Sequence, residues 1–263
     1  MTPTATGTSP FTPSPGAAPL HRMVAAQAGM ELRVMLRNGE QLLLTMVIPV
    51  LLLVGFSTTG VLDLGSGPRV DFLTPGVLAL AVLSTAFTGQ AIGTGFERRY
   101  GVLKRLGATP LSRFGLLAAK TLAVLAVQAL QFLVIGVTAV LLGWRPEAGP
   151  AGIAYCLLLV LLGTAAFSSL ALLMAGTLRA EATLAAANLV YVVLLGLGGV
   201  VFATDRFPEA VQPLLQALPV TALAEGMRAV LADGAAPALA PVAVLALWTA
   251  AGAALAARFF RWE

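Results

Sequence analysis

Six long apolar segments dominate the sequence and limit the folds that it can adopt. They cover roughly residues 42–60, 74–96, 114–143, 152–178, 182–203 and 239–257. An α-helix needs about 20 apolar residues to cross the hydrocarbon core of a bilayer, and each segment is near or above that length. The segments are continuously apolar and lack the alternation of transmembrane β-strands. The sequence therefore predicts an all-α polytopic membrane protein with six transmembrane helices.

The composition agrees with a bilayer as the solvent of this chain. Of its 263 residues, 58% are hydrophobic and 11% are charged, whereas soluble domains carry about 25% charged residues. The net charge of +4 could suggest nucleic acid. However, the basic residues lie at the ends of apolar segments, as orientation signals do, so we expect no nucleic-acid partner. With one cysteine, Cys156, and one histidine, His21, we expect no disulfide framework and no metal site.

The distribution of Lys and Arg predicts the orientation. If the N-terminus lies inside, only four of the 16 basic residues fall in outer segments, namely Arg69, Arg145, Arg206 and Arg228. The other basic residues then lie on the inner side. Because inner loops of membrane proteins are enriched in Lys and Arg, we expect a multi-pass protein of the cell (inner) membrane with both termini in the cytoplasm.

The chain before the first apolar segment divides into two parts. Residues 1–20 are mainly Thr, Pro, Ser, Gly and Ala, which predicts a disordered cytoplasmic tail rather than a signal peptide. Residues 21–40 predict an amphipathic helix, which can lie at the membrane surface in contact with lipid headgroups. Its basic face holds Arg22, Arg33 and Arg37 together with Glu40, and its apolar face holds Val24, Ala28, Leu32 and Met35. Glu31 interrupts the apolar face, and a simple cytoplasmic extension of the first span is the alternative.

The predicted outer loop 204–238 is long and contains two segments with helical spacing of apolar residues. It predicts one helix from Pro208 to about Leu218 and a second from Thr221 to Ala232, neither long enough to span a membrane. The two pieces would form a helical hairpin before the last span, dipping into the outer face or capping it. Glu225 and Arg228 are three positions apart and could pair, either as a solvated pair or as part of an outer gate.

The densest cluster of charge lies at residues 96–113, between the second and third apolar segments. It holds Glu97, Arg98, Arg99, Lys104, Arg105 and Arg113. Residues 98–106 predict a short helix with apolar Val102, Leu103 and Leu106; Gly107 would end it, and Ser112 would cap the next helix. A short charged helix between two spans is suited to dock into a cleft on a soluble partner. The alternative is that these charges only set the topology.

The chain lacks the signatures of an enzyme that powers its own transport. Its only lysines, Lys104 and Lys120, lie outside any phosphate-binding loop motif, so we do not expect it to hydrolyse ATP. Proton- or sodium-driven carriers usually need ionisable groups near the midplane, and the apolar segments carry few away from their ends. An ATP-independent carrier or a membrane-embedded enzyme is the second hypothesis, and a non-transporting anchor for a soluble complex is the third.

The charged stretch also resembles a known family. Its pattern Glu-Arg-Arg-x-Gly-x-x-Lys-Arg-Leu-x-x-Thr-Pro, residues 97–110, is similar to the cytoplasmic signature of type-2 ABC exporter permeases, including drug- and antibiotic-resistance members of actinobacteria. The segment Leu-Pro-Val-Thr-x-x-x-Glu-x-x-Arg, residues 218–228, supports the resemblance. The family's glycine is often followed by Thr, and this chain has Val102 instead.

The resemblance implies a permease that dimerises and pairs with two soluble ABC ATPase subunits, which would use ATP and Mg²⁺ while this chain binds no cofactor. The 98–106 helix would be its coupling helix. The implied coupling residues are Glu97, Arg98, Arg99, Gly101, Lys104, Arg105, Thr109 and Pro110. The implied function is ATP-driven export of an amphipathic or lipophilic substrate, such as a drug, an antibiotic or a lipid-linked molecule, by alternating access.

Small and polar residues recur within three predicted spans. They include Ser84 and Thr88 in the second span, Gln128 and Gln131 in the third, and Asn188 in the fifth. Such residues either line a substrate pathway or join helices to one another inside the bilayer. We favour helix packing, because small and polar side chains are typical of helix–helix contacts in membranes.

Overall fold

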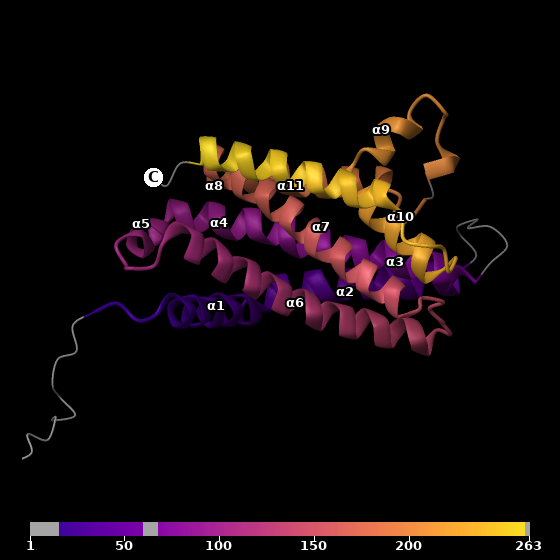
Figure 1. Ribbon diagram of the computed structural model, residues 1–263, viewed down its shortest axis with the longest axis horizontal. Coiled ribbons are helices and arrows are strands. Elements are labelled where there is room, and N and C mark those ends of the chain that lie inside the picture. The colour runs from indigo at the N-terminus through magenta and orange to yellow at the C-terminus, as the bar shows by residue number, and fades with distance from the viewer. Residues whose placement is uncertain (1–15, 60–67, 203, 261–263) are drawn as a thin grey trace, which may run out of the picture.

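The computed structural model of this chain describes residues 16–59, 68–202 and 204–260. Within these ranges, every regular element is a helix (Figure 1). The all-α fold class is therefore confirmed. Most of the predicted tail at 1–20 lies outside the described residues, and the first helix begins at Leu20.

The helices follow one another with short connections. Their bounds are α1 Leu20–Arg37, α2 Gly39–Thr58, α3 Arg69–Val82, η1 Leu83–Gly89, α4 Gln90–Arg99, α5 Val102–Gly107, α6 Arg113–Leu141, α7 Pro150–Thr177, α8 Ala180–Leu197, η2 Thr204–Arg206, α9 Gln212–Gln216, α10 Pro219–Leu231 and α11 Leu239–Phe259. Among the described residues, five helical stretches are long and apolar enough to cross a membrane: Arg69–Arg99, Phe114–Leu141, Pro150–Thr177, Ala180–Leu197 and Leu239–Phe259. The predicted first span contributes a shorter apolar helix, Thr45–Thr58, with Pro49 inside α2. The chain is a multi-pass membrane protein.

Two span boundaries differ clearly from the sequence-based prediction. The second span was predicted at 74–96, but α3, η1 and α4 form one continuous helix from Arg69 to Arg99. Hydropathy alone places the start too late, because polar residues such as Asp71 occupy the first turn. The fifth span was predicted at 182–203, but α8 ends at Leu197, and Gly199 follows with a positive φ of 71°.

Helix α1 ends earlier than the predicted 21–40. Asn38 follows Arg37 at its C-terminus, and α2 begins at Gly39. α1 runs beside α6 in Figure 1. The predicted faces are largely as expected, since Val24 and Leu32 are half-buried and Arg33 is exposed. Glu31, which interrupts the apolar face, is buried at 8% exposure.

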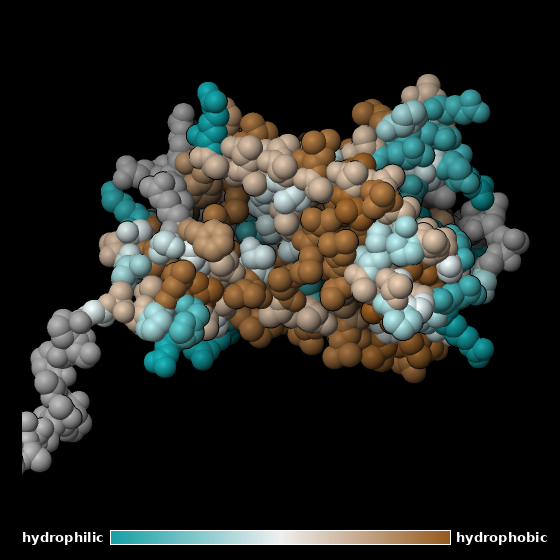
Figure 2. Space-filling view, viewed as in Figure 1, coloured by the Kyte–Doolittle hydropathy of each residue, from teal (hydrophilic) through white to brown (hydrophobic). Residues whose placement is uncertain are grey.

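The continuous helix α3–η1–α4 is the centre of the bundle. Of the residues in its most apolar stretch, 89% are buried, compared with 17% for α8 and for α11 at the periphery. On the face shown in Figure 2, hydrophobic residues cover the middle of the molecule, and hydrophilic residues gather at both ends. We call these the α5 end and the α10 end, after the helix that each contains (Figure 1).

The predicted hairpin before the last span takes a different form. The helix predicted at 208–218 is reduced to the short α9, and the second helix begins at Pro219 rather than Thr221. A proline fits this first position because its missing N–H would have no helical partner there. α10 packs against α3 and α7 and is buried over most of its length. It is part of the bundle, not a cap on its surface.

Candidate functional site

The short helix α5 lies at one end of the bundle, between α4 and α6. The predicted helix 98–106 is wrong at its start, because Arg98 and Arg99 form the last turn of α4. Gly101 then turns the chain with φ +70° and precedes Val102, the first residue of α5. Glycine adopts this left-handed conformation without the steric cost that a Cβ would add. The direction of α5 therefore depends on a local backbone turn.

One face of α5 is anchored and the other is exposed. Leu103 is 1% exposed and fixes α5 to the bundle, whereas Lys104 and Arg105 are exposed. After α5, the hydroxyl of Thr109 donates to the carbonyl of Leu106 at 2.6 Å. Exposed Pro110 follows in the turn. The result is a short, basic helix held at a defined place at the end of the molecule.

The next helix begins as predicted. The Ser112 hydroxyl accepts a hydrogen bond from the Gly115 N–H at 3.1 Å, which caps the N-terminus of α6. This cap satisfies one of the N–H groups that the first turn of a helix leaves unpaired. α5 is thus framed by a left-handed glycine before it and a capped helix after it.

Arg98 and Arg99 join α4 to the connection between α7 and α8. The Arg98 guanidinium donates to the Leu178 carbonyl, and the Arg99 guanidinium pairs with Glu181. The Arg99 and Glu181 side chains are 50% and 63% exposed. Exposed ion pairs of this kind are weak, because solvent screens them. These two predicted coupling residues therefore contact this chain's own α7–α8 connection and the first turn of α8.

Glu97 belongs to a buried ion cluster that we call the Lys120 cluster. Lys120 Nζ lies 2.6 Å from Glu97 Oε2 and 3.1 Å from Glu31 Oε1. The side chains are 7% exposed for Lys120, 23% for Glu97 and 10% for Glu31. The Gln27 amide also donates to Glu31 Oε1 at 2.9 Å. One ammonium therefore links α1, α4 and α6.

This cluster was not predicted from the sequence, in which Glu31 interrupts an apolar helix face and Lys120 is one of the basic residues that predict the orientation. A carboxylate on an apolar helix face and a lysine two turns inside an apolar span were the available signals. Each is costly in a bilayer unless it is paired. A cavity of about 230 Å³ adjoins the cluster and is lined by Glu31, Glu97 and Lys120, among others.

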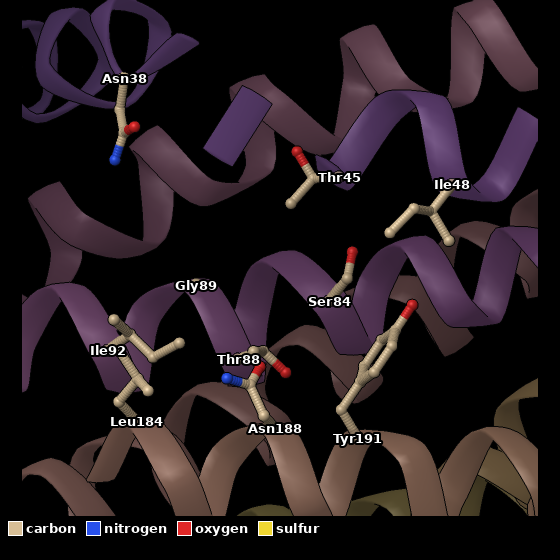
Figure 3. A pocket seen from close by; sticks show the side chains of 10 residues that line it. All are labelled: Asn38, Thr45, Ile48, Ser84, Thr88, Gly89, Ile92, Leu184, Asn188 and Tyr191. Carbon is tan, nitrogen blue, oxygen red and sulfur yellow. The ribbon is translucent and has the colours of Figure 1, made fainter. Parts of the chain in front are cut away.

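A second pocket lies at mid-bundle between α2, η1, α4 and α8 (Figure 3). It has a volume of about 350 Å³ and is lined by Asn38, Thr45, Ile48, Ser84, Thr88, Gly89, Ile92, Leu184, Asn188 and Tyr191. No charged side chain occurs among these described residues. Three predicted pathway residues, Ser84, Thr88 and Asn188, therefore meet in one place.

The wall of this pocket has an unusual backbone. Ser84 and Thr88 belong to η1, which is a π-helix, and such segments occur frequently at functional sites. Among the described residues, the buried Thr88 hydroxyl has no hydrogen-bond partner. In Figure 3, Asn188 of α8 lies beside Thr88. The pocket thus offers uncharged hydrogen-bonding groups within an apolar surround.

The other two predicted pathway residues, Gln128 and Gln131, do not line this pocket and instead join helices. The Thr85 hydroxyl donates to Gln131 Oε1 at 2.8 Å, and Gln131 Nε2 donates to the Thr45 carbonyl at 3.0 Å. The Thr164 hydroxyl donates to Gln128 Oε1 at 2.9 Å. Both glutamines are 1% exposed. Their contacts support the packing interpretation.

At the α10 end, Glu225 and Arg228 bond to different partners. Arg228 Nε donates to the Phe72 carbonyl at 3.1 Å, and Nη2 donates to the Gly199 carbonyl at 2.8 Å. Glu225 accepts a hydrogen bond from the Thr204 hydroxyl. Arg228 is 8% exposed, so the expectation of a solvated pair is wrong.

The charge of Arg228 is retained at this buried position. Desolvation by burial lowers its pKa to about 10, while the nearby carboxylates of Glu225, Asp233 and Asp205 oppose this shift. A pKa of about 10 keeps the guanidinium protonated at neutral pH. Arg228 and these acidic residues line a cavity of about 230 Å³.

The sequence that forms these apolar spans and the short basic helix matches a known family. Residues 27–232 match the ABC-2 type transporter family. The chain belongs to this family. It is a membrane permease component of an ABC transporter, and permeases of this family normally pair with a separate ABC ATPase subunit. A comparison with curated proteins found no match.

In this permease the predicted coupling residues divide into three groups. Lys104, Arg105, Thr109 and Pro110 are exposed on α5 or in the turn after it. Arg98 and Arg99 contact the α7–α8 connection, and Glu97 is part of the Lys120 cluster. Gly101 separates these groups by turning the chain from α4 into α5. The family match includes α5 and the whole Lys120 cluster.

Proposed function

We propose that this permease is the membrane subunit of an ATP-driven exporter that moves an amphipathic or lipophilic substrate outward by alternating access. The observation that carries the proposal is the presentation of α5. Gly101 turns this helix away from α4, Leu103 anchors it, and Lys104 and Arg105 are exposed on it. A soluble ATPase would bind α5 in a groove and move it when ATP binds.

We also propose how the permease is oriented in the membrane and how it assembles with the ATPase. The α5 end faces the cytoplasm of the cell (inner) membrane, in agreement with the excess of Lys and Arg in the predicted inner segments. Two permeases assemble with two ATPase subunits, which bind ATP and Mg²⁺. The exposed apolar surface of the spans contacts membrane lipid (Figure 2).

The mid-bundle pocket supports the proposed class of substrate. Its lining combines apolar side chains such as Ile92 and Leu184 with the uncharged polar groups of Thr88 and Asn188. Burying an unpaired charge in such a site would be costly, whereas a hydroxyl or amide can find a partner there. The pocket therefore suits an amphipathic molecule whose inserted part is uncharged.

A copurification experiment tests the proposal. Tagged permease, extracted from its native membrane, is expected to retain a soluble ATPase that contains a phosphate-binding loop. The double variant Lys104→Glu/Arg105→Glu should lose this partner, because it reverses the charge of the exposed face of α5. The matched control is Arg145→Glu, which reverses an exposed charge in the loop between α6 and α7. Wild-type permease that retains no ATPase would refute the proposal.

Labelling of introduced cysteines tests the orientation separately. The native Cys156 is buried and can be replaced by alanine. Gly107 of α5 and Glu209, between η2 and α9, are both exposed. In intact cells, a membrane-impermeant maleimide should label Glu209→Cys and should label Gly107→Cys only after the cells are opened. The reverse pattern would place α5 outside, where it could not meet a cytoplasmic ATPase.

A further inference from the structure

We propose that the cavity beside the Lys120 cluster binds a protonated amine carried on an apolar group, with the ammonium at Glu31 and Glu97 and the apolar group in the mid-bundle pocket. The cavity has a volume of about 230 Å³ and is lined by residues of α1, α4 and α6, among others. The assignment of such an amine as the exported substrate rests on the proposed function, whereas its binding does not.

The charges that line this cavity do not cancel. Two carboxylates, Glu31 and Glu97, share the one ammonium of Lys120, and no other lining residue among those described is charged. One negative charge is therefore left over. The neighbouring Arg98 and Arg99 are bonded to the α7–α8 connection and to the first turn of α8 instead. An uncompensated charge at a buried position is costly, and a bound cation would remove that cost.

An unpartnered acceptor lines the same cavity. Gln90 of α4 is 7% exposed, and among the described residues its buried Oε1 accepts no hydrogen bond. A buried acceptor without a donor costs free energy, so this atom is suited to an N–H or O–H group of a ligand. Gln90 lies seven residues before Glu97, which is about 10 Å along the helix. We therefore expect a ligand with a second donor some distance from its ammonium.

The cavity leads from the surface to the mid-bundle pocket. Val34 and Tyr100 line it and are 59% and 63% exposed, so it reaches the surface at the α5 end. Asn38 and Gly89 line both this cavity and the mid-bundle pocket (Figure 3). Gln90 follows Gly89 directly in the chain. An amphiphile can thus place its charged end at the Lys120 cluster and its uncharged part in the mid-bundle pocket.

The same features disfavour other ligands. An anion would add to the negative charge that is left over. A divalent metal ion needs several ligands, and the described residues contain no group of three or more His, Cys, Asp or Glu side chains that could hold one. A proton on one carboxylate would cancel the charge but would leave Gln90 Oε1 without a donor. A cation that carries N–H groups satisfies both requirements.

Dansylcadaverine is a suitable probe, because it joins a protonated amine through a pentyl spacer to a sulfonamide N–H and an apolar fluorescent ring. Purified permease in phosphatidylcholine nanodiscs should bind it saturably, with fluorescence above that of empty nanodiscs. The analogue with a hydroxyl in place of the amine should bind about tenfold more weakly, because it cannot form the charge-assisted hydrogen bonds. Equal binding of the two compounds, or no saturable binding of the amine, would overturn the proposal.

Single variants locate the site. Glu31→Gln removes the negative charge that is left over, at nearly constant side-chain size, and should weaken binding of the amine by about tenfold. Glu147→Gln makes the same change at an exposed position between α6 and α7 and is the matched control, which should bind as wild type. Gln90→Leu leaves every charge in place and should weaken binding about threefold. Wild-type affinity in both Glu31→Gln and Gln90→Leu would contradict the assigned site.

A double variant separates net charge from local disruption. Glu31→Gln/Lys120→Met removes the ammonium together with one carboxylate, so that Glu97 again leaves one negative charge. This variant should regain most of the affinity that Glu31→Gln loses. A double variant that folds but binds as weakly as Glu31→Gln would show that the charge balance does not bind the amine. If neither variant folds, the two probes on the wild type and the Gln90→Leu variant still decide.

The lipid composition of the nanodiscs distinguishes two sources of the ammonium. Phosphatidylethanolamine should displace dansylcadaverine if the natural ligand is the headgroup of an aminophospholipid, and should leave binding unchanged if it is a free amphiphilic amine. Either result supports an ammonium site. These measurements require no ATPase. A permease that binds the amine but copurifies with no ATPase would therefore refute the proposed function and not the site.

Discussion

The guanidinium of Arg228 lies over the ring of Phe72, with Cζ 3.8 Å from the ring centroid, while its Nε donates to the backbone carbonyl of the same residue at 3.1 Å. Nη2 donates to the Gly199 carbonyl as well. One side chain of α10 thus joins the first turn of α3 to the segment that follows α8. The outer-gate hypothesis for Arg228 must therefore include a structural role.

Replacement of Arg228 by methionine should destabilise the permease. It removes two hydrogen bonds from a charged donor and leaves the Phe72 and Gly199 carbonyls without these partners, which we expect to lower the free energy of unfolding by about 2–3 kcal/mol. Denaturant unfolding in detergent measures the change. Arg145→Met, which removes an exposed arginine, is the control and should alter stability little. Equal stability of the two variants would contradict this account.

Gly76 should not tolerate a side chain. A Cβ at this position would lie 2.4 Å from the Val200 carbonyl oxygen and 3.2 Å from Arg228 Nη2. The contact with a backbone atom forces a shift, so Gly76→Ala should cost about 1–3 kcal/mol of unfolding free energy.

Gly136→Ala is the matched control for this substitution. A Cβ at Gly136 in α6 meets no atom within 4 Å, so this variant should gain up to about 1 kcal/mol from helix propensity. Thermal denaturation of both purified variants in the same detergent gives the comparison. A stability change of the same sign in both would argue against the close approach of α3 and Val200.

The two buried glutamines of α6 should respond differently to replacement by leucine. Gln131 bridges Thr85 and Thr45, so Gln131→Leu should destabilise the bundle by about 1 kcal/mol, which is typical of polar contacts between membrane helices. Among the described residues, Gln128 Nε2 has no hydrogen-bond partner. Gln128→Leu removes that unsatisfied donor but also the acceptor of the buried Thr164 hydroxyl, so it should destabilise the bundle less than Gln131→Leu. Unfolding of the two variants under identical conditions tests this order, and the reverse order would refute it.

The left-handed turn at Gly101 should control binding of the ATPase. Alanine is disfavoured at φ +70° by roughly 1 kcal/mol, so Gly101→Ala should reduce the population of correctly placed α5 and weaken ATPase binding by about fivefold. Gly101→Asn should retain most of the affinity, because asparagine tolerates this conformation better. Titration of the ATPase against permease in nanodiscs measures both. Equal loss in the two variants would mean that the glycine matters for a reason other than its backbone.

Local features of the coupling region were predictable from the sequence. The Ser112 cap and the turn after Gly107 depend on neighbouring residues, and both occur close to where the pattern places them. The start of α5 was wrong because charge pattern alone does not show where a helix breaks, and the break depends on the conformation of Gly101. The roles of Arg98 and Arg99 also required the structure, since their partners Leu178 and Glu181 lie about 80 residues later in the chain.

The contacts of the predicted pathway residues also could not be derived from the sequence. The apolar spans contain small or polar side chains, among them Ser84, Thr88 and Gln131. Their residue types predict only that each polar group needs a hydrogen-bond partner inside the bilayer. Helix packing places Ser84 and Thr88 on a pocket and directs Gln131 into a contact between helices. The π-helix that carries Ser84 and Thr88 has no signal in the hydrophobic pattern.

By itself, the sequence determined that the chain lies in a bilayer and is helical, because a bilayer requires long apolar helices. It also determined the family, because the motif at 97–110 is contiguous. Only the tertiary structure decided which charges are paired inside. Glu31, Glu97 and Lys120 lie on three helices that are distant in sequence, and each alone would be costly to bury. They are tolerated at these buried positions because they meet in the Lys120 cluster, where each charge has a partner that offsets the cost of its desolvation.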